Sequence, residues 1–331
     1  YVANSSYTVG GDYAPEQTVK GAVEAVNSSD EIRVILVGKQ DMIAKELEKY
    51  EYAKEDIEVV HASEIIDMGD VPTVAIKDKK DSSLVVAMRL VREGKADALV
   101  SAGSTGAVLV GGQLVVGRLK GIKRPPLAPF IPTTKGFSLL IDCGANVDAR
   151  PEHLVQFAQM GSIYYENVMG KKNPTVALLN IGTEEEKGNQ LVKDTKPLMK
   201  ECKNINYIGS VEARELVSGA ADVIVCEAFV GNVVLKFFEG LALTLFGSLK
   251  KGLMSSTRTK LGALLVKPAL KGLKNQFDTS SQGGAPLLGL KGLVVKAHGN
   301  SSSKEIEIAL KQCISFKKQK INEKIKESIC D

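Results

Sequence analysis

The sequence predicts a three-layer α/β/α fold built on a mainly parallel, mixed sheet. Apolar runs of strand length alternate with segments of helix length along most of the 331 residues. Most of these runs are continuously apolar rather than alternating, which is typical of strands covered by helices on both faces. The length suits about two domains or one large α/β unit.

Six runs have the composition of strands, and these are 32–38, 57–62, 97–103, 137–144, 175–182 and 222–228. The helices expected between and before them cover 15–28, 82–93, 104–119, 151–169, 188–201 and 211–218. Pro151 stands near the start of one of these helices, where its missing N–H costs nothing. A glycine-punctuated strand over 280–302 and a charged helix over 302–328 are expected to close the chain.

Residues 230–275 depart from this alternation and are predicted to form a helical hairpin that projects from the sheet. The first helix is apolar on nearly all sides, with only Lys236 and Glu239 interrupting it. A polar turn and a second apolar helix follow, with a break expected at Lys267-Pro268. No long uncharged apolar run and no secretory signal are recognised, so we expect no membrane-spanning helix.

Charge and cysteine content narrow the class of protein. The net charge is only +4, but residues 249–300 hold nine Lys or Arg and one acid, Asp278, which indicates an acidic partner or an anionic surface. Five scattered cysteines without a C-x-x-C pair indicate reduced thiols in a cytoplasm, without disulfides or a zinc site. Three histidines are too few to indicate a histidine-rich metal centre, and no metal is predicted.

The stretch "DALVSAGSTGAVLVGG" (97–112) is the first candidate site. A strand leads through a glycine-rich turn into a helix, whose free N–H groups and dipole suit an anion. Hydroxyls and bare amides are available, but the lysine of a nucleotide-binding P-loop is absent. The candidate anion ligands are Ser101, Gly103, Ser104, Thr105 and Gly106. The alternative is a tight turn that needs glycine for backbone conformation or close packing.

Three further glycine-containing turns follow predicted strands, namely "DCGANVDARPE", "NIGTEEEKGN" and "CEAFVGN". Ligands bind at the carboxyl ends of strands in open α/β sheets, so four such turns favour a shared cleft. Other residues expected in this cleft are Asp12, Asp142, Asn146, Asp148, Asn189, Gly231 and His298. The carboxylates could bind a metal or orient donors, and His298 could be catalytic or structural.

Lys187 and Asn232 are the candidate polar groups of the last two turns. Lys187 could neutralise an oxyanion or protonate a leaving group, or it could be a solvated charge after three acids. Asn232 could cap its helix or donate its amide to a carbonyl oxygen. Cys143 and Cys226 invite a thiol-nucleophile interpretation, but no His-plus-acid set supports it and buried free cysteines are common.

An ordered set of motifs between about residue 10 and residue 315 resembles the bacterial phosphate acyltransferase family. These motifs are "GGDYAP", "SAGSTGA", "LAPFIPT", "DCGANVDARPEHLVQFA", "LLNIGTEEEKGN", "GSVEARE", "AFVGNVVLK", "GGAPLLG" and "KAHG". The resemblance implies that inorganic phosphate attacks a long-chain acyl carrier protein thioester, giving acyl phosphate for glycerol-3-phosphate acylation in phospholipid synthesis. It implies no cofactor and no nucleic acid.

The resemblance also implies a fold similar to phosphotransacetylase and the isocitrate/isopropylmalate dehydrogenases. Residues 1–331 would then form one unit of two intertwined subdomains that share one sheet, in a homodimer. Phosphate would be held by the 101–106 turn, the thioester oxyanion by Asn232, and Lys187 would neutralise charge or protonate the thiolate.

Three departures from the family pattern stand in this sequence. Tyr7, Thr8 and Val9 replace an Asp-Ala-Met, Ser104 replaces an asparagine, and Glu227-Ala228 replaces Asp-Gly. They leave a catalytically impaired, membrane-associated homologue as one alternative. A short-chain acyl-CoA phosphotransacetylase is another, and a dehydrogenase is disfavoured because the four turns contain only one arginine, Arg150.

The hairpin combines apolar and basic side chains, which suits peripheral contact with an anionic membrane. The same surface could dock the acidic carrier protein or pack in a dimer. The residues predicted to make these contacts are Leu253, Met254, Arg258, Lys260, Leu261, Leu265 and Lys267. We therefore expect a cytoplasmic protein that associates peripherally with membranes.

Overall fold

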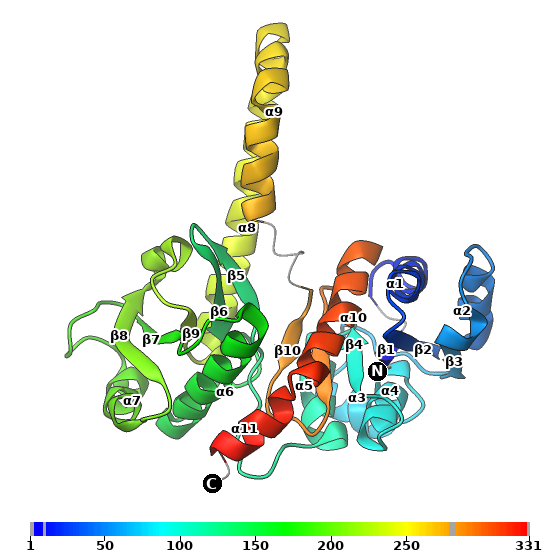
Figure 1. Cartoon of the computed structure of the whole chain (residues 1–331), viewed down its shortest axis with the longest axis horizontal. Helices are drawn as coiled ribbons and strands as arrows, with labels where there is room; N and C mark the ends of the chain where they lie inside the picture. The colour runs from blue at the N-terminus through cyan, green and yellow to red at the C-terminus, as the bar shows by residue number, and fades with distance from the viewer. Residues whose placement is uncertain (1–2, 9–10, 278–282, 330–331) are drawn as a thin grey trace. The chain divides into compact units, whose positions relative to one another are not determined.

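The computed structural model describes residues 3–8, 11–277 and 283–329 (Figure 1). The chain forms two compact units that are interleaved along the sequence. The first unit comprises Tyr1–Pro129, Gln159–Asn173 and Ser280–Asp331, and the second comprises Phe130–Ala158 and Pro174–Thr279. Each unit has its own sheet.

The first unit is built on a six-stranded sheet in the order β10-β11-β4-β1-β2-β3. All neighbours are parallel except the edge pair β10 and β11. Thr8 of β1 and Lys296 of β11 both lie beside Ser101 of β4, so three carboxyl ends reach one edge. The strands are β1 (Ala3–Thr8), β2 (Ile32–Gly38), β3 (Ile57–His61), β4 (Ala98–Ser101), β10 (Ala285–Leu287) and β11 (Leu293–Lys296).

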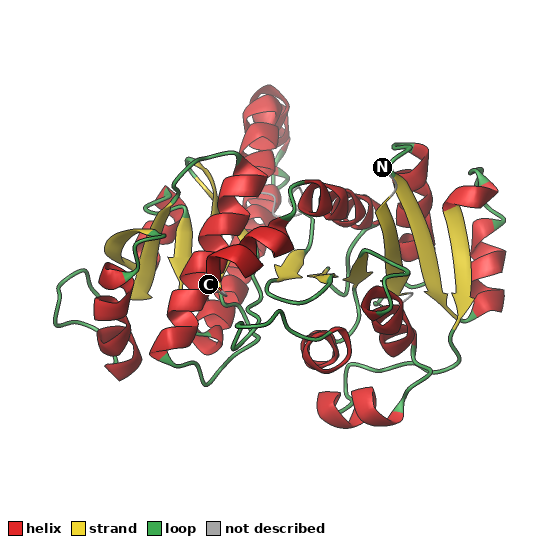
Figure 2. Cartoon of the chain, turned by 60° about the horizontal axis from the view of Figure 1, so that its bottom comes forward, coloured by secondary structure: helices red, strands yellow, loops and turns green. Residues whose placement is uncertain are grey.

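Helices cover both faces of this sheet (Figure 2). Helices α1 (Glu16–Asn27) and α10 (Ser303–Lys318) pack together on one face, and α3 (Pro72–Asp78), α4 (Ser83–Arg92) and α5 (Thr105–Gly111) lie on the other. A π-helical turn, η2 (Gly112–Val116), continues α5. The remaining elements are α2 (Gln40–Leu47), η1 (Lys54–Asp56) and α11 (Ile321–Ile329).

The second unit is built on a five-stranded sheet in the order β5-β6-β9-β7-β8, parallel except for the edge strand β5. Its strands are β5 (Phe130–Thr133), β6 (Gly136–Ile141), β7 (Thr175–Asn180), β8 (Asn206–Glu212) and β9 (Val223–Val225). Its helices are α7 (Gln190–Glu201), η3 (Ala213–Ser218), α8 (Ala228–Leu253) and α9 (Thr257–Gln276), with the first part of α6 (Pro151–Met169). Leu140, Ile224 and Leu179 belong to its core.

The predicted α/β class with mainly parallel strands is confirmed, and all six predicted strands are present; β2 has the predicted bounds, and the other five end earlier than predicted. The single shared sheet was wrong, because the strands pair into two separate sheets. Strands β1, β5 and β8 and helices α2 and α3 were not predicted. The sequence of β1 shows the reason, because Asn4, Ser5 and Ser6 give it little apolar character.

Three local predictions also need correction. Helix α9 runs through Lys267-Pro268 without a break, because one proline removes a single hydrogen bond from a helix that packs along α8. The described part of 280–302 forms two antiparallel strands, which turn at Gly289. The charged helix over 302–328 is divided into α10 and α11 near Lys320, which has a φ of 51°.

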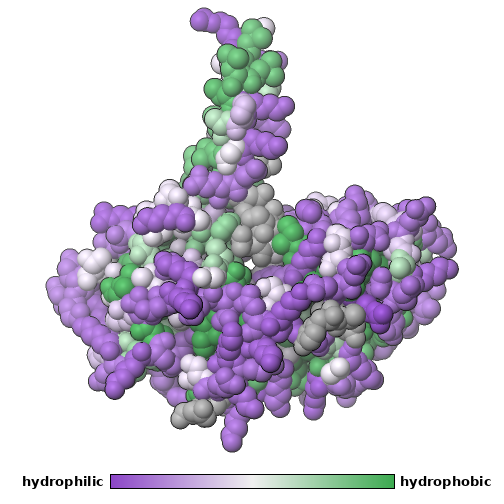
Figure 3. Space-filling view, in the orientation of Figure 1, coloured by the Kyte–Doolittle hydropathy of each residue, from purple (hydrophilic) through white to green (hydrophobic). Residues whose placement is uncertain are grey.

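Helices α8 and α9 lie side by side as the predicted hairpin (Figure 1). Helix α8 has 26 residues and contains an 18-residue window with a mean hydropathy of 1.6, so by length and composition alone it could cross a membrane. The expectation that no segment could do so was wrong, because Lys236 and Glu239 do not offset the apolar residues around them. Apolar side chains are exposed along the outer part of the hairpin (Figure 3).

Candidate functional site

The turn after β4 in the first unit contains the predicted anion ligands. Ser101 and Ser104 are buried, with 1% and 8% of their surface exposed, whereas Thr105 is exposed. The Ser101 Oγ accepts a hydrogen bond of 3.2 Å from the Gly103 N–H, so this side chain folds back onto the turn. A Cβ at Gly106 would lie 2.6 Å from Pro72 Cγ, so this glycine is explained by close packing.

Two other turns of the first unit meet this one at the edge of the sheet. The Asp12 N–H donates to the Gly299 carbonyl over 2.8 Å, and a Cβ at Gly11 would lie 3.0 Å from the Cβ of Ala102. The predicted residues Asp12 and His298 are therefore brought near the turn after β4, and both side chains are exposed. Val9 lies outside the described residues.

The helix after β4 begins without a side-chain cap, as do α1, α2 and α3. Ser104 stands at its N-cap, and among the described residues its side chain makes no capping hydrogen bond. In five other helices the N-cap side chain accepts a backbone N–H, and these caps are Ser82, Asn189, Glu227, Ser256 and Ser302. The amides that open the Thr105–Val116 helix are thus not used by their own cap, and an anion can accept their hydrogen bonds.

In the second unit, the turn after β6 is organised by Asp142. Its carboxylate is fully buried and accepts hydrogen bonds from the Ala145 N–H (3.1 Å), the Asn146 N–H (2.8 Å) and the Asn146 side-chain amide (2.7 Å). Asp142 and Asn146 therefore stabilise the turn itself, and a phosphate cannot use these amides. Asp148 lies further along and is exposed.

The turn after β9 is likewise occupied by its own carboxylate. Glu227 caps α8 by accepting the N–H groups of Phe229 and Val230, so Asn232 is not the cap that one interpretation suggested. Asn232 is exposed in the next turn of the helix, where its amide can reach a ligand. A Cβ at Gly231 would lie 1.9 Å from the Asp142 carbonyl oxygen, so α8 touches the turn after β6 at this glycine.

The turn after β7 presents Lys187 to solvent while its backbone is held. The Lys187 carbonyl accepts from Asn180 Nδ2 (3.1 Å) and from Lys196 Nζ (3.0 Å). Asn189, predicted in the cleft, is exposed and caps α7 by accepting the Val192 N–H at 2.9 Å. The helices that follow the turns after β7 and β9 are thus capped by Asn189 and Glu227, whereas the described contacts of Ser104 include no capping hydrogen bond.

Lys196 is the residue of this region that the sequence reading missed. It is 3% exposed in α7, and its ammonium contacts three carbonyls of the preceding turn. It shares the buried face of α7 with Thr195 and Met199. A lysine at helical spacing among apolar or buried positions was therefore the sequence signal that could have identified it as a buried charge.

The two cysteines proposed as nucleophiles are unsuited to that role. Cys143 and Cys226 are buried, and burial raises the pKa of both thiols well above the ordinary value, with nearby Cys226 and Asp142 adding to the effect on Cys143. A raised thiol pKa lowers the thiolate fraction at neutral pH, and the thiolate is the nucleophile.

Native protein treated with iodoacetamide at pH 8 is therefore expected to be alkylated at Cys202, which is partly exposed, well before Cys143 or Cys226. Peptide mass spectrometry over a time course measures this order. Rapid alkylation of Cys226 in folded protein, with loss of turnover at the same rate, would contradict it.

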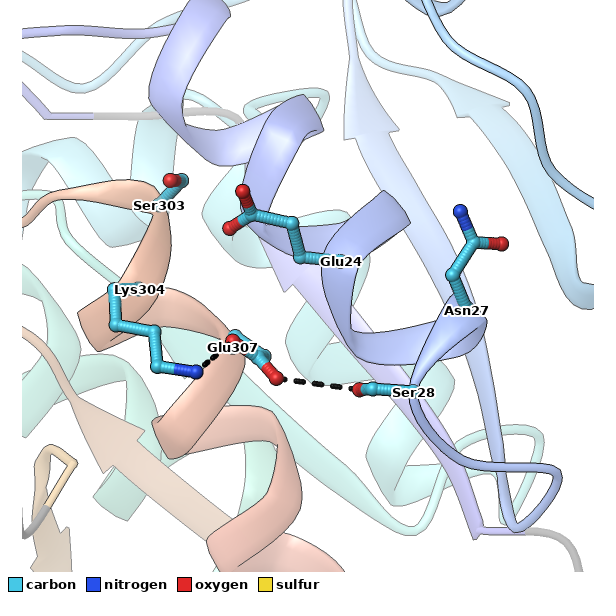
Figure 4. A pocket seen from close by; sticks show the side chains of 6 residues that line it. All are labelled: Glu24, Asn27, Ser28, Ser303, Lys304 and Glu307. Carbon is cyan, nitrogen blue, oxygen red and sulfur yellow. Dashed lines mark hydrogen bonds and ion pairs between the residues drawn. The ribbon is translucent and has the colours of Figure 1, made fainter.

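Outside these turns, a depression of about 440 Å³ lies between α1 and α10 (Figure 4). Glu307 accepts hydrogen bonds there from the Ser28 hydroxyl (3.2 Å) and the Lys304 ammonium (2.7 Å), so its charge is already paired. Its lining contains none of the predicted site residues and consists of Glu24, Asn27, Ser28, Ser303, Lys304 and Glu307. Within the described ranges, no group of three His, Cys, Asp or Glu side chains could hold a metal ion.

The hairpin residues predicted for membrane, carrier or dimer contact are mostly exposed. Leu261 and Leu265 of α9 are 62% and 84% exposed, and Met254 is 51% exposed. The basic side chains of Arg258, Lys260 and Lys267 are exposed as well, and Leu253 is half-buried.

Comparison with known proteins places this geometry in a family. Residues 7–324 match the family described as "Fatty acid synthesis protein". A phosphate acyltransferase of Alkaliphilus oremlandii is 54% identical over 321 residues, covering 97% of this chain and 95% of that protein. A phosphate acyltransferase of Clostridium acetobutylicum is 50% identical and covers 96% of both. A phosphotransacetylase structure from Streptococcus pyogenes, at 17% identity and a TM-score of 0.65 over 94% of both chains, shares the fold.

Proposed function

This chain belongs to the family of the phosphate acyltransferases, and we propose that it transfers a long-chain fatty acyl group from acyl carrier protein to inorganic phosphate. A phosphate oxygen attacks the thioester carbonyl carbon, the C–S bond breaks, and the carrier thiolate takes up a proton. The acyl phosphate then serves glycerol-3-phosphate acylation. No cofactor is required by this chemistry.

The observation that carries the proposal is the uncapped helix after β4, together with the buried hydroxyls of Ser101 and Ser104. Backbone amides and neutral hydroxyls can hold phosphate without a cationic contact that would lower its nucleophilicity. The assigned phosphate ligands are Ser101, Gly103, Ser104, Thr105 and Gly106. Catalysis then depends on the positioning of phosphate against the thioester carbonyl carbon and on hydrogen-bond donors directed at the tetrahedral oxyanion.

Lys187 and Asn232 are proposed as the catalytic donors. Both side chains are exposed and come from turns whose backbones are fixed, so each can contact a ligand without rearrangement of the fold. Asn232 donates its amide to the thioester oxygen as negative charge develops there. Lys187 stabilises the same charge or protonates the departing thiolate.

A phosphorolysis assay tests this function. Palmitoyl-acyl carrier protein and phosphate are incubated with the protein, and hydroxylamine traps acyl phosphate as hydroxamate, with acetyl-CoA as the parallel substrate. Phosphate-dependent hydroxamate from the carrier substrate is expected, and a reaction without phosphate corrects for direct attack on the thioester. Product from acetyl-CoA alone would make the protein a short-chain phosphotransacetylase, and no product from either would support an impaired homologue.

We further propose that the exposed hairpin contacts anionic membranes, with carrier docking nearby and a homodimer packing at its base. Apolar side chains such as Leu261 and Leu265 can enter the headgroup region while the lysines around them meet anionic lipid. This arrangement would place a cytoplasmic enzyme at the membrane where its acyl product is used.

The double substitution Leu261→Glu/Leu265→Glu is expected to abolish flotation with vesicles of mixed phosphatidylglycerol and phosphatidylcholine. Both side chains are exposed, so the carboxylates lower apolar burial in lipid without unfolding the protein. Flotation in a sucrose gradient measures binding, and Lys260→Gln, which removes one charge but no apolar group, should reduce it only slightly. A double variant that floats like wild type would disprove membrane contact through this face.

A further inference from the structure

We propose that Lys196 is a positioning residue for Lys187, and that its buried ammonium holds the turn from which Lys187 acts. The inference rests on the proposed function, in which the Lys187 ammonium stabilises charge in the transition state. It concerns a residue that touches neither phosphate nor thioester.

The contacts of Lys196 all converge on one turn. Its Nζ donates to the carbonyls of Glu184 (3.0 Å), Glu185 (2.8 Å) and Lys187 (3.0 Å). An ammonium has three N–H donors, so these three carbonyls satisfy it completely. The side chain is only 3% exposed, so its charge lies beneath the turn rather than in solvent.

Burial of such a charge is expensive, and the fold alone does not require it. Met199, one turn further on the same face of α7, fills its position with an apolar side chain of similar length. The cost is therefore best explained by what the ammonium holds in place. Three backbone carbonyls of the turn converge on this one ammonium.

The turn is fixed from both of its flanking elements. Asn180, at the end of β7, donates from Nδ2 to the Gly182 carbonyl (2.9 Å) and to the Lys187 carbonyl (3.1 Å). The Lys187 carbonyl thus receives one donor from β7 and one from α7, while its own ammonium stays exposed. A fixed backbone with an accessible charged group is the arrangement that a catalytic lysine needs.

A double-mutant cycle separates positioning from a general structural role. In the wild-type background, Lys196→Met is expected to lower kcat for phosphorolysis roughly ten- to a hundred-fold, with little change in KM for phosphate, because misplacement of a catalytic group acts on the transition state. In the Lys187→Ala background, the same substitution is expected to lower kcat no further. Equal losses in both backgrounds would overturn the proposal.

Lys200→Met is the matched control. Lys200 also lies in α7 and contacts the same turn, but through an exposed ion pair of 2.8 Å with the Glu185 side chain rather than through carbonyls. It should leave kcat within about twofold, as expected for an exposed ion pair. A loss as large as that of Lys196→Met would count against the role of the carbonyl contacts.

If Lys196→Met does not fold, as judged by circular dichroism, Asn180→Ala provides the same cycle from the other side of the turn. Loss of kcat that disappears in the Lys187→Ala background supports a positioned turn, and additive losses overturn it. Failure of the proposed function is distinguishable, because wild-type protein would then yield no acyl phosphate from palmitoyl-acyl carrier protein.

Discussion

Gly231→Ala is expected to destabilise the protein by about 3 kcal/mol or more, and to leave much of it insoluble. The added Cβ would lie 1.9 Å from the Asp142 carbonyl oxygen and 3.0 Å from the Cys226 Sγ. The obstructing oxygen belongs to the backbone of the turn after β6, which Asp142 and Asn146 already hold by hydrogen bonds. It cannot move aside as a flexible side chain could. Helix α8 would have to shift away from the sheet of its own unit.

Gly240→Ala is the matched control, because Gly240 lies in the same helix and a Cβ there would meet nothing within 4 Å. Alanine should stabilise the helix by about 0.5–1 kcal/mol relative to glycine. Urea unfolding followed by circular dichroism measures both variants. Equal stabilities for the two variants would show that α8 does not approach the β6 turn as described.

Lys187→Ala and Asn232→Ala are each expected to lower kcat/KM for phosphorolysis by about 10²- to 10³-fold, the loss found when one oxyanion donor is removed. Their folding should be almost unaffected, since both side chains are exposed and alanine is a favourable residue in α8. Unfolding free energies within about 0.5 kcal/mol of wild type would confirm this.

Lys236→Ala serves as the control for both variants. Lys236 is an exposed lysine one turn beyond Asn232, and it forms a 2.7 Å ion pair with Glu239. Its loss should change kcat/KM by less than about threefold, since exposed ion pairs contribute little. Near-normal turnover in Lys187→Ala or in Asn232→Ala would remove that residue from the mechanism.

The strands were predictable because burial on both faces demands continuous apolar runs, as in the "TVALLN" of β7. Strand β1 escaped prediction because its place in the sheet is set by pairing with β2 and β4 rather than by its polar sequence. The division into two sheets could not be predicted from the sequence either, because it depends on hydrogen bonding between strands that are distant in sequence.

The glycine-containing turns after the strands were predictable from the sequence, but the hydrogen bonds that their residues make were not. Asp142, Asn189 and Glu227 are the residue types that bind ligands, and they are also the types that cap helices and close turns. The structure shows all three accepting backbone N–H groups. Ser104 stands at a cap position after a strand without such a bond, and its residue type does not distinguish it from Ser302, which does cap its helix.

The interleaving of the two units affects how the protein is made. During synthesis the ribosome completes Pro174–Thr279 of the second unit before it reaches Ser280–Asp331, the last part of the first. Until β11 emerges, β4 is an unpaired edge of a largely assembled sheet, and such edges promote aggregation. The unit that is begun first is therefore finished last. A polypeptide truncated or stalled after residue 279 would depend on a chaperone to cover the exposed edge of β4.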